Sequence, residues 1–249
     1  MGKERPRRET TVTIRLILVV EGHTEEAFAN DMLRPHLAGF GVDLSASRVE
    51  TKRGGLKGGM TNYARARGHL VHWMKQERKN ADARFSTMFD LYGLPDDFPD
   101  FKKASAQRDP LKRAALLEAA FQRDIGDRRF IAYIQVHEFE ALLFADIEKL
   151  VVYFPERASE VDELREEARA IPTPEHIDDG EETTPSKRIV RRIPEYKGLK
   201  PVAGPIIASK IGLPKLRAEC VHFGQWLTRC EALAGSPPAP NGRRTGRRI

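Results

Sequence analysis

Acidic residues lie at or shortly after the ends of three of the four segments of this chain that are rich in β-branched and aliphatic residues. They are Glu21, Asp90, Glu138 and Glu140. Ligands of an open parallel sheet bind beyond the carboxyl ends of its strands, so these carboxylates are expected to gather at one edge of a sheet. Glu25 lies one helical turn beyond Glu21 and is expected to face the same cleft. Such a group of hard oxygen ligands favours Mg²⁺ or Mn²⁺.

Strands and helices in alternation must position these carboxylates. The segments with the composition of strands are 12–20, 46–51, 84–89 and 129–136. Between them, residues 63–77 and 111–121 have the apolar spacing of helices. This alternation predicts an α/β fold, with a mainly parallel sheet and helices on both of its faces.

The chain is expected to have four regions. These are a disordered basic N-terminus (1–11), an α/β core (12–145), a helical C-terminal region that packs on the core (146–234) and a disordered basic tail (235–249). No apolar run approaches the ~20 residues of a membrane span, and the start of the chain lacks the apolar segment of an export signal. Two cysteines are too few for a disulfide framework. A cytoplasmic protein is therefore expected.

Two internal blocks of opposite charge are more informative than the pI of about 9.4, because the net charge of +6 comes from the two ends of the chain. Residues 156–182 contain eleven acids and three arginines, a net −8. Residues 186–217 contain nine bases and one acid, a net +8. The basic block either contacts a phosphate backbone or is neutralised by the acidic block. Arg53 and Lys57, in a glycine-rich loop, are further candidates for phosphate contacts, with Lys187, Arg188 and Lys210 from the basic block.

Three motifs together resemble a bacterial Toprim-related family of unknown function, domain family 4276. They are Val19-Val-Glu-Gly-His-Thr-Glu-Glu26, Phe89-Asp-Leu-Tyr-Gly-Leu-Pro95 and Tyr133-Ile-Gln-Val-His-Glu-Phe-Glu-Ala-Leu-Leu-Phe144. The first is similar to the Toprim motif of overcoming-lysogenization-defect (OLD) nucleases, in which a strand runs into Glu-Gly-x-Thr-Glu. The resemblance extends over residues 12–234.

This resemblance implies a Toprim-like metal centre that cleaves phosphodiesters. Glu21 matches the Toprim glutamate, Glu25 the second acid of the OLD motif, and Asp90 the first aspartate of the Toprim Asp-x-Asp. The second aspartate position is Tyr92, so the second metal ligand must come from elsewhere. The candidates are Glu138, Glu140, Asp96 and Asp97. Only one of Glu138 and Glu140 is expected to face the metal, with Glu138 favoured.

Three functions are compatible with these residues. The first is a Mg²⁺-dependent nuclease, acting on DNA rather than RNA, with Glu21, Glu25, Asp90, Glu138 and His137 as the catalytic group. The resemblance adds an SMC/ABC-type ATPase, encoded separately, as a partner in phage defence or repair; a second copy of the chain is another expected partner, and a membrane is not. The second function is a degenerate Toprim module that binds an ATPase or nucleic acid without catalysis. The third is phosphotransfer on a small phosphoester.

Overall fold

The computed structural model describes residues 13–49, 60, 62–177, 180 and 182–235. The strands are β1 (Ile14–Val20), β2 (Val42–Arg48), β3 (Ala83–Asp90), β4 (Phe130–Ile131) and β5 (Ile134–Gln135). The α-helices are α1 (His23–Phe28), α2 (Arg34–Ala38), α3 (Tyr63–Gln76), α4 (Phe101–Ser105), α5 (Pro110–Ile125), α6 (Leu150–Tyr153), α7 (Ala158–Arg169), α8 (Pro185–Arg192), α9 (Tyr196–Ile211), α10 (Leu213–Glu219) and α11 (Val221–Glu231). The remaining elements are a π-helical turn, η1 (Ala29–Leu33), and the 3₁₀ segments η2 (Phe139–Lys149), η3 (Pro155–Arg157), η4 (Pro174–His176) and η5 (Ala232–Ala234).

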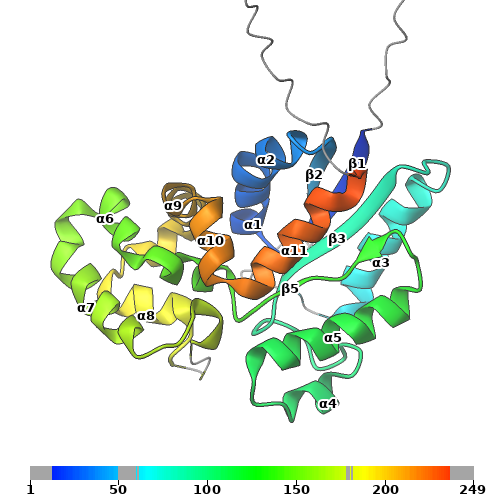
Figure 1. Ribbon diagram of the computed structural model, residues 1–249. Coiled ribbons are helices and arrows are strands. Elements are labelled where there is room, and N and C mark those ends of the chain that lie inside the picture. Colours follow the sequence, from blue (N-terminus) through cyan, green and yellow to red (C-terminus); the bar gives the residue numbers. More distant parts are fainter. Residues whose placement is uncertain (1–12, 50–59, 61, 178–179, 181, 236–249) are drawn as a thin grey trace, which may run out of the picture.

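The sheet is parallel, in the order β2-β1-β3-β4, with β5 also pairing with β3. Alternate residues of β1 enter two separate hydrophobic clusters, because successive side chains of a strand point to opposite faces. Leu16 and Leu18 contact the α1, α2 and C-terminal side, whereas Ile17 and Val19 contact the α3 and α5 side. Figure 1 shows these helices on the two sides of the sheet. The predicted α/β fold is confirmed.

The fourth strand differs from its prediction. A continuous strand over 129–136 was expected, but the chain leaves the ladder between β4 and β5. There the Thr87 hydroxyl donates to the Tyr133 carbonyl at 2.8 Å and lies 3.3 Å from the Tyr133 amide. The neighbouring Ser86 hydroxyl donates to the Ile131 carbonyl at 2.7 Å. Two side-chain hydroxyls of β3 therefore replace main-chain partners, and the strand is interrupted.

The C-terminal helices pack against the α/β core. Helix α9 contacts α1 and η2, and Gly204 allows this close approach, since a Cβ atom there would lie 3.0 Å from the Phe139 ring. From α11, the Trp226 ring stacks on Tyr133 with centroids 4.4 Å apart, and its Nε1 donates to Ser86. No helix in the described part of the chain could span a membrane. The predicted disordered ends, 1–11 and all but Gly235 of the tail, lie outside the described residues.

Candidate metal and phosphate site

Glu21 and Asp90 lie at the carboxyl ends of adjacent parallel strands. Strands β1 and β3 pair with each other up to Val20 and Met88, and the two carboxylates follow within two residues of these positions. One Glu21 oxygen accepts from the Asp90 amide at 3.3 Å, and the other accepts from the Met60 amide at 3.1 Å. The prediction that Glu21 and Asp90 meet at one sheet edge is confirmed.

Glu25 is held beside Glu21 by the start of α1. Gly22 is the N-cap residue, and its amide donates to the Glu25 side chain at 2.8 Å. A Cβ atom at Gly22 would lie 3.0 Å from that carboxylate, so a larger residue there would require the Glu25 side chain to shift. Only 5% of Glu25 is exposed. The Glu-Gly-x-x-Glu spacing thus brings both carboxylates into one turn of chain.

Glu138 and Glu140 both face this group, although only one was expected to. Glu138 has an extended backbone, with φ −148° and ψ 170°, and η2 begins directly after it. Because the chain passes from extended to 3₁₀ geometry between the two residues, neither a strand nor a regular helix separates their side chains. Ser186 of α8 donates to both Glu138 oxygens, through its amide and through its hydroxyl at 3.0 Å. Glu140 lies 3.3 Å from the Tyr196 hydroxyl.

Lys200 of α9 faces the same group and was not singled out from the sequence. Its Nζ lies 3.3 Å from Glu140. Lys200 follows Tyr196 by four residues, so both point from one face of α9 toward Glu140. This spacing was the available signal, but nothing in the sequence shows which face of α9 meets the sheet edge.

Together these residues line a cavity of about 220 Å³. Its lining comprises Glu21, Gly22, Thr24, Glu25, Asp90, Glu138, Glu140 and Lys200. Five carboxylates and one ammonium group therefore share a small volume. We call it the carboxylate cavity.

Burial and mutual repulsion make the ionised carboxylates unfavourable. Burial is the main cause that raises the pKa of Glu25 to about 7, with repulsion from Glu21 adding to it. Burial also raises the pKa of Glu140 to about 7, although Lys200 opposes this rise. The pKa of Glu21 is raised by burial, and that of Asp90 lies well above its usual value through burial and the charges of its four acidic neighbours. The cavity is thus short of positive charge.

The Asp90 carboxylate has an unused oxygen. Oδ1 is buried and has no hydrogen-bond partner among the described residues, although Asp90 as a whole is partly exposed. Buried polar atoms normally have partners, so an orphaned carboxylate oxygen is a candidate metal ligand. No three Asp, Glu, His or Cys side chains of the described residues stand ready in a metal-binding arrangement. The carboxylates fit a hard cation by type and location, and their side chains would have to turn to bind it.

A model of a protein family matches residues 20–231, which include every residue of the carboxylate cavity. The chain belongs to the DUF4276 family, a domain of unknown function. No curated protein and no solved structure matches the chain. The assignment to DUF4276 made from the three motifs is therefore confirmed, and within this domain the site must be interpreted from its own residues.

The remaining predicted site residues of this DUF4276 chain lie apart from the cavity lining. His137 is buried, with a positive φ of 62°, and its Nε2 lies 3.1 Å from the Glu175 carbonyl. Tyr92 is 45% exposed, and its amide donates to the His137 carbonyl. Neither side chain lines the cavity. Arg53 and Lys57 lie outside the described residues.

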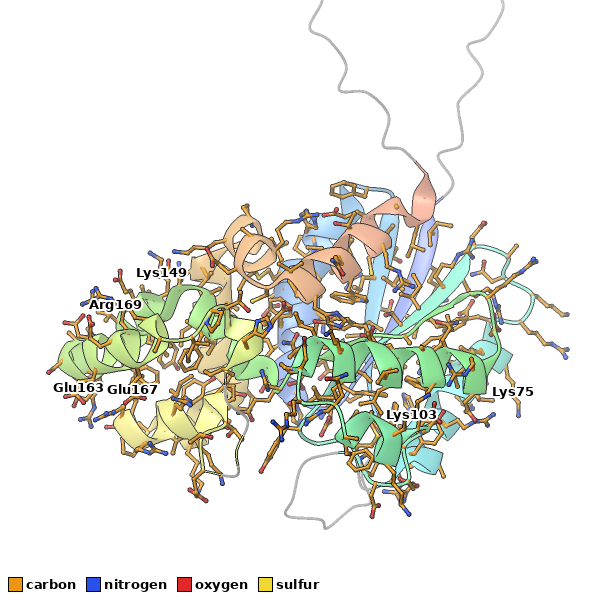
Figure 2. All side chains as sticks on the ribbon, turned by 60° about the horizontal axis from the view of Figure 1, so that its bottom comes forward. Lys75, Lys103, Lys149, Glu163, Glu167 and Arg169 are labelled. Atoms are coloured by element: carbon orange, nitrogen blue, oxygen red, sulfur yellow. The ribbon has the colours of Figure 1, made fainter. Side chains whose placement is uncertain are left out.

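The predicted phosphate contacts of the basic block are largely matched by acids. Lys187 lies 3.1 Å from Glu182, and Arg188 lies 3.7 Å from Glu167. Lys210 is exposed near the end of α9. Of the two readings of the charge blocks, the contacts favour mutual neutralisation. Figure 2 shows α7, with Glu163 and Glu167, lying beside α8, the helix that carries Arg188 and Arg192.

Proposed function

We propose that the carboxylate cavity binds a divalent cation, Mg²⁺ or Mn²⁺, and hydrolyses phosphodiester bonds of nucleic acid, DNA in particular. The observation that carries this proposal is the buried, unpartnered Oδ1 of Asp90 among four other carboxylates. Such a group is destabilising without a counter-charge, and Lys200 supplies only one. A divalent cation would remove the deficit.

Each residue has a task in this proposal. Asp90 and Glu21 would hold the cation from two strand ends, and Glu25, Glu138 and Glu140 would complete or orient its shell. Ser186 fixes the Glu138 carboxylate, so that side chain is oriented before any ligand arrives. The cation, when bound, would neutralise a phosphate and assist water as the nucleophile. Lys200 has one ammonium group near the cavity that could pair with a phosphate oxygen.

The Toprim-like relation belongs to this proposal as well. The Toprim resemblance leaves a missing acid at Tyr92, and that vacancy favoured a degenerate, inactive module. Glu138 and Glu140 both line the cavity, so the acid count does not depend on position 92. This supports an intact centre over a degenerate one. An SMC/ABC-type ATPase partner remains part of the proposal on the strength of the resemblance alone.

The test is cleavage of linear and circular DNA with Mg²⁺ and with Mn²⁺, by the chain alone and together with a candidate ATPase. Glu21→Gln keeps the side-chain shape and removes one charge from the cavity, so it should abolish most cleavage. Glu26→Gln is the matched control, because Glu26 makes an ion pair with Arg48 and does not line the cavity. It should retain wild-type cleavage.

Mn²⁺ titration calorimetry separates the alternatives. Binding that is lost in Asp90→Asn, without cleavage under any condition, would indicate a non-catalytic module. Cleavage that survives Glu21→Gln would assign the nuclease to the partner. Turnover of mononucleotides in preference to polymers would select the small phosphoester function instead.

A further inference from the structure

Four arginines gather at the amino end of the sheet, at the edge opposite to the carboxylate cavity. They line a second cavity, of about 390 Å³, which we call the arginine pocket. Its lining comprises Arg78, Asn80, Ala81, Arg84, Asp127, Arg128 and Arg129. The residues come from the segment after α3, the start of β3 and the segment between α5 and β4. Two separate stretches of chain, 78–84 and 127–129, thus converge on one pocket.

The arginine pocket is remote from the carboxylate cavity. Arg84 is the second residue of β3 and Asp90 is the last. Six residues of strand at about 3.3 Å each separate them by roughly 20 Å. Figure 1 shows β3 running from the turn that follows α3 to its other end near β5. A small molecule in one cavity therefore cannot reach the other, but a polymer can.

Most of the charge of the arginine pocket is uncompensated. Arg129 is the exception, because it pairs with Asp127 at 2.9 Å and also lies over the Phe85 ring. These two contacts hold its guanidinium group in place. Among the described residues, Arg84 donates to the Ala81 and Ala83 carbonyls, which bring no negative charge. In the described part of the chain, the exposed Arg78 and Arg128 have no carboxylate within 4.0 Å. Four guanidinium groups thus meet one carboxylate, a net +3.

The basic block on α8 and α9 provides the contrast. Arg192 contacts Glu163 and Glu167, and Arg188 contacts Glu167. Those arginines stabilise contacts inside the C-terminal region. Because the arginine pocket keeps its charge, it is better suited than the basic block to recruit an external anion.

We propose that the arginine pocket binds phosphate groups of a nucleic-acid backbone. It would be an anchor, meaning a second contact point for the polymer that is remote from the carboxylate cavity. Guanidinium groups form paired hydrogen bonds with phosphate oxygens, and the pocket offers exposed guanidinium groups rather than apolar lining. The separation of roughly 20 Å corresponds to about six base pairs of duplex. That the polymer reaches both sites rests on the proposed function; the binding of phosphate by the pocket does not.

The experiment measures binding of a fluorescent 30-base-pair duplex in EDTA over a range of salt concentrations, so that cleavage plays no part. The test variant is Arg78→Ala with Arg128→Ala. The control is Lys102→Ala with Lys103→Ala, which removes the same charge from exposed positions of α4. Each lost phosphate contact should lower the slope of log K against log salt by about 0.9, so the arginine variant should lose about 1.8. Between 50 and 200 mM salt, wild-type affinity should then fall about tenfold more than that of the arginine variant.

The control pair should keep the wild-type slope. Equal slopes in the arginine and control variants, with both proteins folded by circular dichroism, would overturn the proposal. A second arm tests small ligands: inorganic phosphate and ATP are added during thermal unfolding. A rise in Tm that is lost in the arginine variant, while duplex binding is unchanged, would assign the pocket to a small phosphate ligand and reject the anchor.

The two proposals fail in different ways. If no cleavage is ever found, the slope measured in EDTA still decides the anchor. If the anchor is absent, cleavage can still be lost in Glu21→Gln. A duplex too short to span the roughly 20 Å should be cleaved equally by wild type and the arginine variant, whereas a long duplex should be cleaved more slowly by the variant at subsaturating concentration.

Discussion

Raising the pH from 5 to 8 without divalent metal should destabilise this protein, and Mn²⁺ should reverse the effect. The pKa values of Glu25 and Glu140 rise from 4.5 to about 7 on folding. Between these values the folded state binds more protons than the unfolded chain, so the free energy of unfolding falls as pH rises. The contribution is complete below the unfolded pKa of 4.5 and is lost as pH passes the folded pKa of about 7.

The size of the effect follows from the two shifts. A rise from 4.5 to about 7 corresponds to about 3 kcal/mol for one carboxyl group. The two groups are neighbours in one cavity, so their contributions are not additive, and we expect about 3–5 kcal/mol in total. This is a large share of the ~5–15 kcal/mol that stabilises a typical domain. Mn²⁺ at 100 times its Kd would restore about 2.7 kcal/mol, and it binds the ionised carboxylates that predominate at pH 8.

Urea unfolding followed by circular dichroism, at pH 5 and pH 8, in EDTA and in Mn²⁺, measures all four free energies. Asp124 and Asp127 do not interfere, because their pKa values are lowered and they stay ionised over this range. His222 beside Glu118 has a raised pKa and adds a loss of the same sign, so the contribution of Glu140 is taken as the difference between wild type and Glu140→Gln. That variant should lose about half of the pH dependence. Equal stability of the wild type at both pH values in EDTA would refute the reasoning.

Three further predictions concern close contacts, and each is checked by unfolding or titration. Gly224→Ala should destabilise the fold by about 1–3 kcal/mol, since its Cβ would lie 2.7 Å from the Arg217 carbonyl oxygen, whereas the control Gly68→Ala has open space in α3 and should be neutral or stabilising by up to about 1 kcal/mol. Thr87→Val should cost about 1–3 kcal/mol in urea unfolding, because the buried Tyr133 carbonyl loses its donor; an unchanged midpoint would show that the main chain finds another partner. Gly93→Ala places a Cβ 3.2 Å from a Glu21 oxygen, so Mn²⁺ affinity should fall while the unfolding free energy in EDTA changes little.

Local pattern was sufficient for the elements that bury a continuous apolar face. The predicted helix at 63–77 is α3, and the predicted strand at 12–20 contains β1. Prediction from the local pattern failed where side-chain hydroxyls take the place of main-chain hydrogen-bond partners in the sheet. The break between β4 and β5 depends on Ser86 and Thr87 of another strand, and apolar composition alone does not reveal that their hydroxyls point along the ladder.

The candidate site likewise contains residues that local sequence features predict and residues that they do not. Glu21, Glu25 and Asp90 follow from strand ends and helix starts, which are local features. Lys200 and Ser186 enter through α9 and α8, more than forty residues beyond Glu140 in the sequence, and their approach depends on packing of the C-terminal helices. The boundary expected at residue 145 therefore does not coincide with a boundary of the site.

Because of the position of the C-terminal helices, the carboxylates of the cavity have partners from two different parts of the chain. Glu21 and Asp90 accept hydrogen bonds from the main chain of the α/β core, whereas Glu138 and Glu140 contact Ser186, Tyr196 and Lys200 of the C-terminal region. A cation bound between the two pairs would link the sheet edge to α8 and α9. Loss of these helices would expose Glu140 and remove the positive charge nearest to it. A protein truncated after residue 145 would thus retain the motifs and the five carboxylates but lack Ser186, Tyr196 and Lys200, which contact Glu138 and Glu140.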